Sequence, residues 1–120
     1  MNINPFQRKI FWGGLVLGVL VVSLLPQTQV FIETPFSDKI DHFLAYFILS
    51  FVALLASTEK HSVFMILIAH ILLGIGIEVA QSFVPGRYME VLDGVANTIG
   101  VGFGAVLYFV FRKVKPKNPN

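Results

Sequence analysis

The sequence predicts an all-α integral membrane protein, a bundle of four transmembrane helices. Its 120 residues are 55% hydrophobic and only 13% charged, and the mean hydropathy is +0.74. A soluble domain of this composition would lack the polar residues needed to cover its surface. Four long apolar segments follow one another between short polar turns, and no linker or repeat divides them. We therefore expect residues 1–120 to form a single domain.

The first apolar segment runs from about Ile10 to Leu25, behind Arg8 and Lys9. The residues that follow, 26–29, offer no small-residue cleavage site, so we expect a retained anchor and not a signal peptide. The second segment begins near Asp38 and ends at Ala56. Its fully apolar part is short for ~30 Å of hydrocarbon, so its polar first turn is expected at the outer interface or inside the bundle.

The third segment runs from about Ser62 to Phe83 and is stopped by the turn dipeptide at 85–86. The fourth spans Val91 to Phe111, and a basic tail follows at 112–120. Glycines recur four residues apart on two of the predicted helices. This spacing predicts small faces at which helix backbones approach closely. The pairs are Gly14 with Gly18 and Gly100 with Gly104.

Basic residues predict the orientation in the membrane. On one side, Arg8, Lys9, Lys60, Arg112, Lys113, Lys115 and Lys117 flank the segments. The other side has only Lys39 and Arg87. Positive charge is retained in the cytoplasm, so this asymmetry predicts cytoplasmic N- and C-termini. The two remaining loops would then face outward.

Strongly polar side chains gather at the outward ends of three predicted helices. Such groups are costly in lipid and usually face a bundle interior. Within each helix they recur every three or four residues, so each set shares one face. The expected site comprises Asp38, Lys39, His42 and Tyr46 on the second segment, Glu78 and Gln81 on the third, Arg87 on the loop, and Asp93 and Asn97 on the fourth. Arg87 is long enough to form a bidentate pair with Glu78 or Asp93.

The ordered set of motifs resembles the VanZ-like membrane protein family. The resemblance rests on the string from Asp38 to Tyr46, on Glu78-x-x-Gln81, on Pro85-Gly86-Arg87 and on Asp93-x-x-x-Asn97-x-x-Gly100. It covers residues 38–104, a little over half of the chain. The resemblance implies a small helical membrane protein of bacterial envelopes, whose namesake is linked to low-level resistance to the glycopeptide teicoplanin. The family name does not supply a reaction.

Several of these residues also have structural interpretations, which the sequence leaves open. Glu78 and Arg87 could form an ion pair that fixes a loop. Asp93 could serve only as an N-terminal helix charge, and Asn97 as an interhelical hydrogen bond. His42 is either a general base, a metal ligand or an interfacial histidine bonded to its neighbour.

Tyr46 is interpreted as an interface aromatic residue with access to the site. His70 lies two helical turns deeper than Glu78, and we expect a core histidine with satisfied hydrogen bonds, outside the site.

Other chemistries find little support. The chain has no cysteine, no H-E-x-x-H, no P-loop and no G-x-S-x-G motif. His42 with Glu78 and Asp93 would be an unusual zinc set, so neither a metal nor a cofactor is predicted. No basic aromatic surface points to nucleic acid. The lysines of the tail fit anionic lipid at the cytoplasmic leaflet.

Three functional classes remain. The first is an envelope protein whose outward site binds a lipid head group or a lipid-linked cell-wall precursor, with Lys39 and Arg87 recognising its anionic part. The second is an intramembrane enzyme in which Glu78 and Asp93 act as acid and base, assisted by His42. The third is a proton-coupled transporter. Four helices form only a small pore, so transport would require a homo-oligomer.

Overall fold

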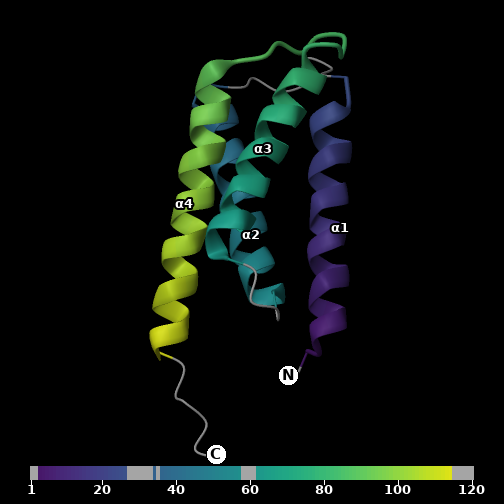
Figure 1. Cartoon of the computed structure of the whole chain (residues 1–120). Helices are drawn as coiled ribbons and strands as arrows, with labels where there is room; N and C mark the ends of the chain where they lie inside the picture. Colours follow the sequence, from purple (N-terminus) through teal and green to yellow (C-terminus); the bar gives the residue numbers. More distant parts are fainter. Residues whose placement is uncertain (1–2, 27–33, 35, 58–61, 115–120) are drawn as a thin grey trace, which may run out of the picture.

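The computed structural model describes residues 3–26, 34, 36–57 and 62–114, and these form an antiparallel bundle of four helices. The helices are α1 (Pro5–Leu24), α2 (Ser37–Ala56), α3 (Val63–Gln81) and α4 (Val91–Val114). Each is long and apolar enough to cross a membrane, and the described residues contain no strand. The beginning of α1 and the end of α4 lie at the same end of the bundle (Figure 1). The predicted fold class is confirmed.

Two helix ends differ from the prediction. The first helix begins at Pro5 because Asn4 caps it: the Asn4 side chain accepts from the Gln7 N–H at 2.8 Å, and the Gln7 side chain accepts from the Asn4 N–H at 3.0 Å. The last helix continues to Val114, so Arg112 and Lys113 belong to its final turn. Cations are favourable there because they face the negative end of the helix dipole. The predicted basic positions Lys60, Lys115 and Lys117 lie outside the described residues.

Close packing between α2 and α4 is the main contact of the bundle. A Cβ atom at Gly100 would lie 2.3 Å from the Phe43 carbonyl oxygen, and one at Gly104 would lie 2.0 Å from Ser50 Oγ. Ser50 is fully buried, and its hydroxyl donates to the Val101 carbonyl across the contact at 3.2 Å. The backbones therefore meet at distances that only glycine permits, as expected for this pair.

The other glycine pair does not do this. A Cβ atom at Gly14 or Gly18 would meet nothing within 4 Å, so the expectation of close backbone approach was wrong for α1. No residue of α1 is buried. Instead of a glycine seam, polar contacts at several levels hold this helix. Trp12 Nε1 donates to His70 Nε2 at 3.3 Å, and Arg8 Nη1 donates to the Leu55 carbonyl at 3.3 Å.

Two polar residues lie deep in the bundle. His70 is 3% exposed and donates from Nδ1 to the Ile66 carbonyl at 2.7 Å, so with Trp12 both ring nitrogens have partners, as expected of a core histidine. Tyr46 is 2% exposed and packs with Ile77 and Val101 in the core. Its interpretation as an interface aromatic residue was wrong, because its side chain points between the helices and not towards the membrane surface.

Alanine substitutions test the contact between α2 and α4. Gly100→Ala and Gly104→Ala should each lower the free energy of unfolding by about 1–3 kcal/mol, because the added methyl must displace backbone or Ser50. Gly102→Ala is the matched control, since a Cβ there meets nothing within 4 Å. Equilibrium unfolding in detergent micelles measures the difference. Equal effects at positions 100 and 102 would contradict this account of the packing.

Candidate functional site

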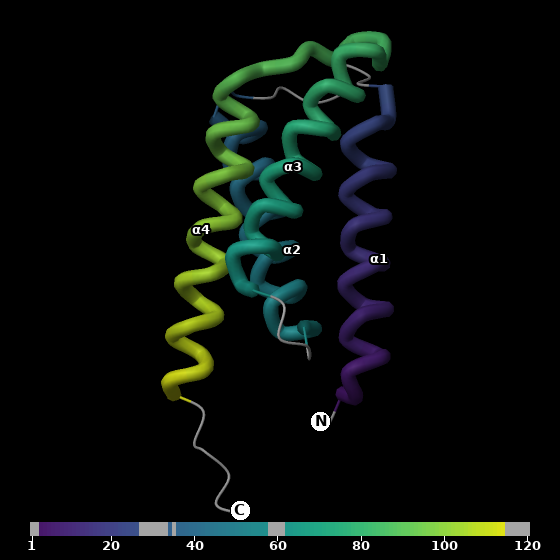
Figure 2. The backbone as a smooth tube through the Cα atoms, viewed as in Figure 1, coloured from purple at the N-terminus to yellow at the C-terminus, as the bar shows by residue number. Residues whose placement is uncertain are grey.

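The start of α2, the end of α3 and the start of α4 lie at the end of the bundle opposite the beginning of α1 and the end of α4 (Figure 2). The predicted polar residues of these helices come from the first turns of α2, the last turn of α3 and the first turns of α4. The packing of α2 against α4 places Asp93 beside Lys39 and His42. Five members of the predicted site are buried, each no more than 4% exposed: Tyr46, Glu78, Gln81, Asp93 and Asn97.

Lys39 is surrounded by carboxylates. Its ammonium lies 2.6 Å from Asp93 Oδ1 and 3.6 Å from Asp38 Oδ2, and it donates a short hydrogen bond to Glu90. The Asp93 side chain is only 5% exposed and that of Lys39 is 22% exposed, so this ion pair is largely withdrawn from water. Lys39 was predicted to recognise an anionic ligand. In the structure, its charge is already neutralised by the protein itself.

His42 occupies the centre of the site, and its two ring nitrogens face different partners. Nδ1 lies 3.0 Å from Asn97 Oδ1 and 3.5 Å from Glu78 Oε1. Nε2 lies 3.7 Å from Asp38 Oδ1 and 3.7 Å from Asp93 Oδ2, which is too long for a hydrogen bond to either. His42 is thus bonded on one edge and open on the other.

Buried hydrogen-bonding groups remain without a partner among the described residues. They include both carboxylate oxygens of Glu78, the Tyr46 hydroxyl and Asn97 Nδ2. Such groups are costly in a protein interior, and each needs a reason. Around His42, the described side chains therefore leave hydrogen-bonding capacity unfilled.

Arg87 does not form the predicted pair with Glu78 or Asp93. Its Nε donates to the Leu25 carbonyl at 2.8 Å and its Nη2 donates to the Val22 carbonyl at 3.2 Å, both at the end of α1. Carbonyls of a last helical turn lack partners within the helix, which makes them suitable acceptors for a guanidinium. Gln81 Nε2 similarly donates to the Ser23 carbonyl at 3.0 Å. Both side chains therefore fasten α1 to the rest of the bundle.

A groove runs between α1 and α2 beside this cluster, and we call it the α1–α2 groove. It has a volume of about 500 Å³. Its polar end is lined by Asp38, Asp41, His42, Gln81 and Arg87. Its apolar part lies along Gly14, Leu15, Gly18, Val19 and Ala45. The two α1 glycines thus provide space for a groove and not a helix contact.

Two acidic residues at this end were missed by the sequence reasoning. Glu90 pairs with Lys39, and Asp41 lines the groove. A count of acidic as well as basic residues in the turns at this end of the bundle would have indicated them. Among the described residues at this end, five carboxylates (Asp38, Asp41, Glu78, Glu90 and Asp93) stand against two cations, Lys39 and Arg87. The site is therefore acidic.

The helices and the buried polar cluster define the class: a small multi-pass membrane protein with an ionisable site at one end of its bundle. The VanZ/LLP1 family model matches residues 2–112, and the chain belongs to this family. A curated relative, described as uncharacterized protein C11E3.10 of Schizosaccharomyces pombe, is 28% identical over 110 residues, which cover 89% of this chain and 67% of the yeast protein. No solved structure matches the chain.

Removal of the Lys39 charge tests the electrostatics of the site. Lys39→Met should lower the free energy of unfolding by about 2 kcal/mol, because Asp93 loses its closest cation. The effect should be smaller than for a fully buried ion pair, because the Lys39 side chain is 22% exposed. Glu90→Gln should cost less than ~1 kcal/mol, because the Glu90 side chain is 53% exposed. Thermal and denaturant unfolding in micelles measure both. Recovery of stability in the Lys39→Met/Asp93→Asn double variant would identify the stranded carboxylate as the cause.

Proposed function

We propose that the α1–α2 groove binds a membrane lipid by its head group, with part of an acyl or prenyl chain along α1. The observation that carries the proposal is the shape and polarity of the groove. Its charged end and its apolar, glycine-lined part follow one another along the helix axis. A lipid has the same order of polar and apolar parts in a membrane leaflet.

The balance of charges indicates which head groups fit. The Lys39 ammonium is paired with carboxylates, and the Arg87 guanidinium donates to backbone carbonyls. An anionic group would meet the carboxylates of Asp38 and Asp41 as well as the Arg87 guanidinium, whereas amines and hydroxyls would find acceptors in the two carboxylates. Head groups that carry amines or several hydroxyls are the favoured class. A lipid-linked cell-wall precursor offers amines and hydroxyls on its peptide and sugars, and its anionic diphosphate would have Arg87 as a cationic partner in the groove lining.

Glycopeptide susceptibility would follow from this binding. A protein that holds a lipid-linked precursor, or the lipid tail of a drug, changes how much of either is available at the membrane surface. Family membership is consistent with such a role, since VanZ-type proteins are associated with teicoplanin resistance. The relative in a fission yeast shows that similar chains are not confined to bacteria, so ordinary phospholipids belong in the same test.

Filling the groove should abolish this binding without unfolding the protein. Gly18→Leu places a side chain where a Cβ meets nothing within 4 Å, and it should weaken lipid binding at least tenfold, or about 1.4 kcal/mol. Gly76→Leu is the matched control, because Gly76 is an exposed α3 glycine with equally open surroundings outside the groove. Native mass spectrometry with phosphatidylethanolamine, phosphatidylglycerol and a lipid-linked disaccharide pentapeptide gives the affinities.

The Gly76→Leu control also determines how an unchanged affinity of the Gly18→Leu variant is interpreted. Equal binding by the Gly18→Leu and Gly76→Leu variants would contradict the groove as the binding site. A modified lipid among the products would instead support the enzyme interpretation. In cells, expression of the chain should raise teicoplanin resistance, and the Gly18→Leu variant should raise it less than the Gly76→Leu variant.

We further propose that both chain ends lie in the cytoplasm, which places the site at the outer face of a bacterial cytoplasmic membrane. The excess of basic residues on the flanks near the termini supports this orientation. The chain has no cysteine, so a single introduced cysteine can report the orientation directly. A membrane-impermeant maleimide should label Tyr88→Cys in intact cells and Val114→Cys only after permeabilisation. Both positions are largely exposed. The reverse pattern would overturn the orientation.

A further inference from the structure

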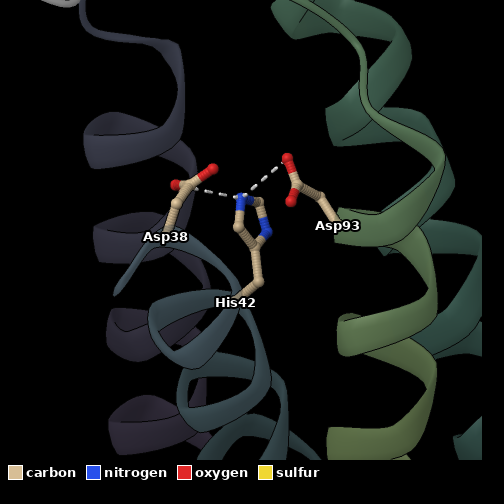
Figure 3. A group of neighbouring side chains, drawn as sticks. All are labelled: Asp38, His42 and Asp93. Carbon is tan, nitrogen blue, oxygen red and sulfur yellow. Dashed lines mark ion pairs between the residues drawn. The ribbon is translucent and has the colours of Figure 1, made fainter. Parts of the chain in front are cut away.

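We propose that Asp38, His42 and Asp93 bind one divalent transition-metal ion at the polar end of the α1–α2 groove. Figure 3 shows the imidazole of His42 between the two carboxylates, one from α2 and one from α4. One potential ligand atom from each residue lies within 4.8 Å of the other two. The proposal rests on this cluster and does not require that a lipid binds.

The distances between the potential ligand atoms fit a bound metal ion better than a shared proton. Nε2 of His42 is 3.7 Å from Asp38 Oδ1 and 3.7 Å from Asp93 Oδ2. A shared proton would draw these atoms to hydrogen-bond length, near 2.8 Å. Metal bonds of roughly 2.0–2.2 Å place neighbouring ligand atoms roughly 3–3.6 Å apart, depending on the coordination geometry. Small side-chain movements convert the observed arrangement into such a set.

The hydrogen bonding of His42 presents the correct nitrogen. Asn97 Oδ1 is 3.0 Å from Nδ1, and a carbonyl oxygen requires a donor, so Nδ1 carries the proton. Nε2 faces two carboxylates. A bare lone pair there would be repelled by them, so this nitrogen either carries a second proton or binds a cation. A histidine ligand is commonly fixed in this way, through a hydrogen bond at the nitrogen that does not bind the metal.

Glu78 supplies an independent indication. Its side chain is 5% exposed and has no side-chain hydrogen-bond partner among the described residues, with only the backbone N–H of Glu90 close to it. Oε1 lies 3.5 Å from His42 Nδ1, on the side away from the proposed ion. A carboxylate in this position behind a histidine ligand helps to orient the imidazole ring. The proposed site would thereby give this buried acid a role.

The balance of charge also calls for a cation. Four carboxylates (Asp38, Glu78, Glu90 and Asp93) surround Lys39 and His42, and Lys39 is the only lysine or arginine that pairs with them among the described residues. One divalent ion would remove most of the remaining negative charge. Lys39 binds Oδ2 of Asp38 and Oδ1 of Asp93, which leaves the other oxygen of each aspartate directed at His42.

The donor set suggests the kind of metal. One imidazole and two carboxylates suit zinc or manganese, whereas calcium and magnesium prefer oxygen ligands alone. Asp38 and His42 also line the groove, so coordination positions on that side stay open. Water or a hydroxyl or phosphate oxygen of a bound molecule could occupy them.

The first experiment uses the unaltered protein, with any affinity tag removed. The protein is stripped with a chelator, dialysed and titrated with Zn²⁺ or Mn²⁺ by calorimetry. We expect one site per chain. Pulsed electron paramagnetic resonance of the Mn²⁺ form should show coupling to one imidazole nitrogen, which changes to the ¹⁵N pattern when histidine is labelled. This readout needs no substitution, so it stands even if a variant fails to fold.

Two asparagine variants then locate the site. Asp38→Asn should weaken metal binding at least tenfold, whereas Asp41→Asn, which alters a groove carboxylate outside the proposed ligand set, should leave it unchanged. Glu78→Gln should weaken it by roughly 10–100-fold, the usual effect of losing an outer partner of a histidine ligand. Circular dichroism in the same micelles checks that each variant is helical.

The outcomes separate this proposal from lipid binding. The absence of a stoichiometric site, the absence of imidazole coupling, or equal weakening by Asp38→Asn and Asp41→Asn would each overturn the metal site. None of these results bears on the Gly18→Leu comparison. Loss of lipid binding in that variant with metal binding intact would place the two ligands in separate parts of the groove.

Discussion

The contact between α2 and α4 is the constraint on which the rest of the structure depends. At Gly100 and Gly104 the two helices approach so closely that a single methyl group would collide with backbone or with Ser50. Two turns further out, the same contact sets Asp93 against Lys39 and His42. Charged groups at this depth are tolerable only when a partner is held in place, and glycine packing provides that precision. The ionisable site is thus a consequence of how two helices pack.

The sequence was sufficient for the class of fold and for the expectation that polar residues of three helices gather at one end of the bundle, because hydropathy and helical spacing act locally. It was insufficient for partners that depend on how helices are placed in space. Gly14 with Gly18 has the same spacing as Gly100 with Gly104, yet only the α4 pair meets another backbone. Arg87 had two carboxylates within its reach, but the free carbonyls at the end of α1 hold it instead. Spacing identifies a face but not what the face contacts.

The same limit explains the errors about individual side chains. Tyrosine is a residue type that is common at membrane interfaces, and only the placement of α2 in the bundle puts Tyr46 in the core. Glu90 stands in a connecting segment without periodicity, so nothing local marks it as the partner of Lys39. His70 was predictable, since an isolated histidine in an apolar helix must satisfy both ring nitrogens, and Trp12 and Ile66 do so.

The exposure of α1 bears on how a lipid would reach the α1–α2 groove. This helix contributes no buried residue; it is held by polar contacts near its ends and at Trp12, and by Val19 and Leu20, which pack against the core. In a membrane, the groove beside it would open towards the surrounding lipid. A bound lipid would exchange with other lipids of the bilayer by lateral diffusion. The occupancy of the groove would then depend on the mole fraction of that lipid, so the composition of the membrane becomes part of the binding equilibrium.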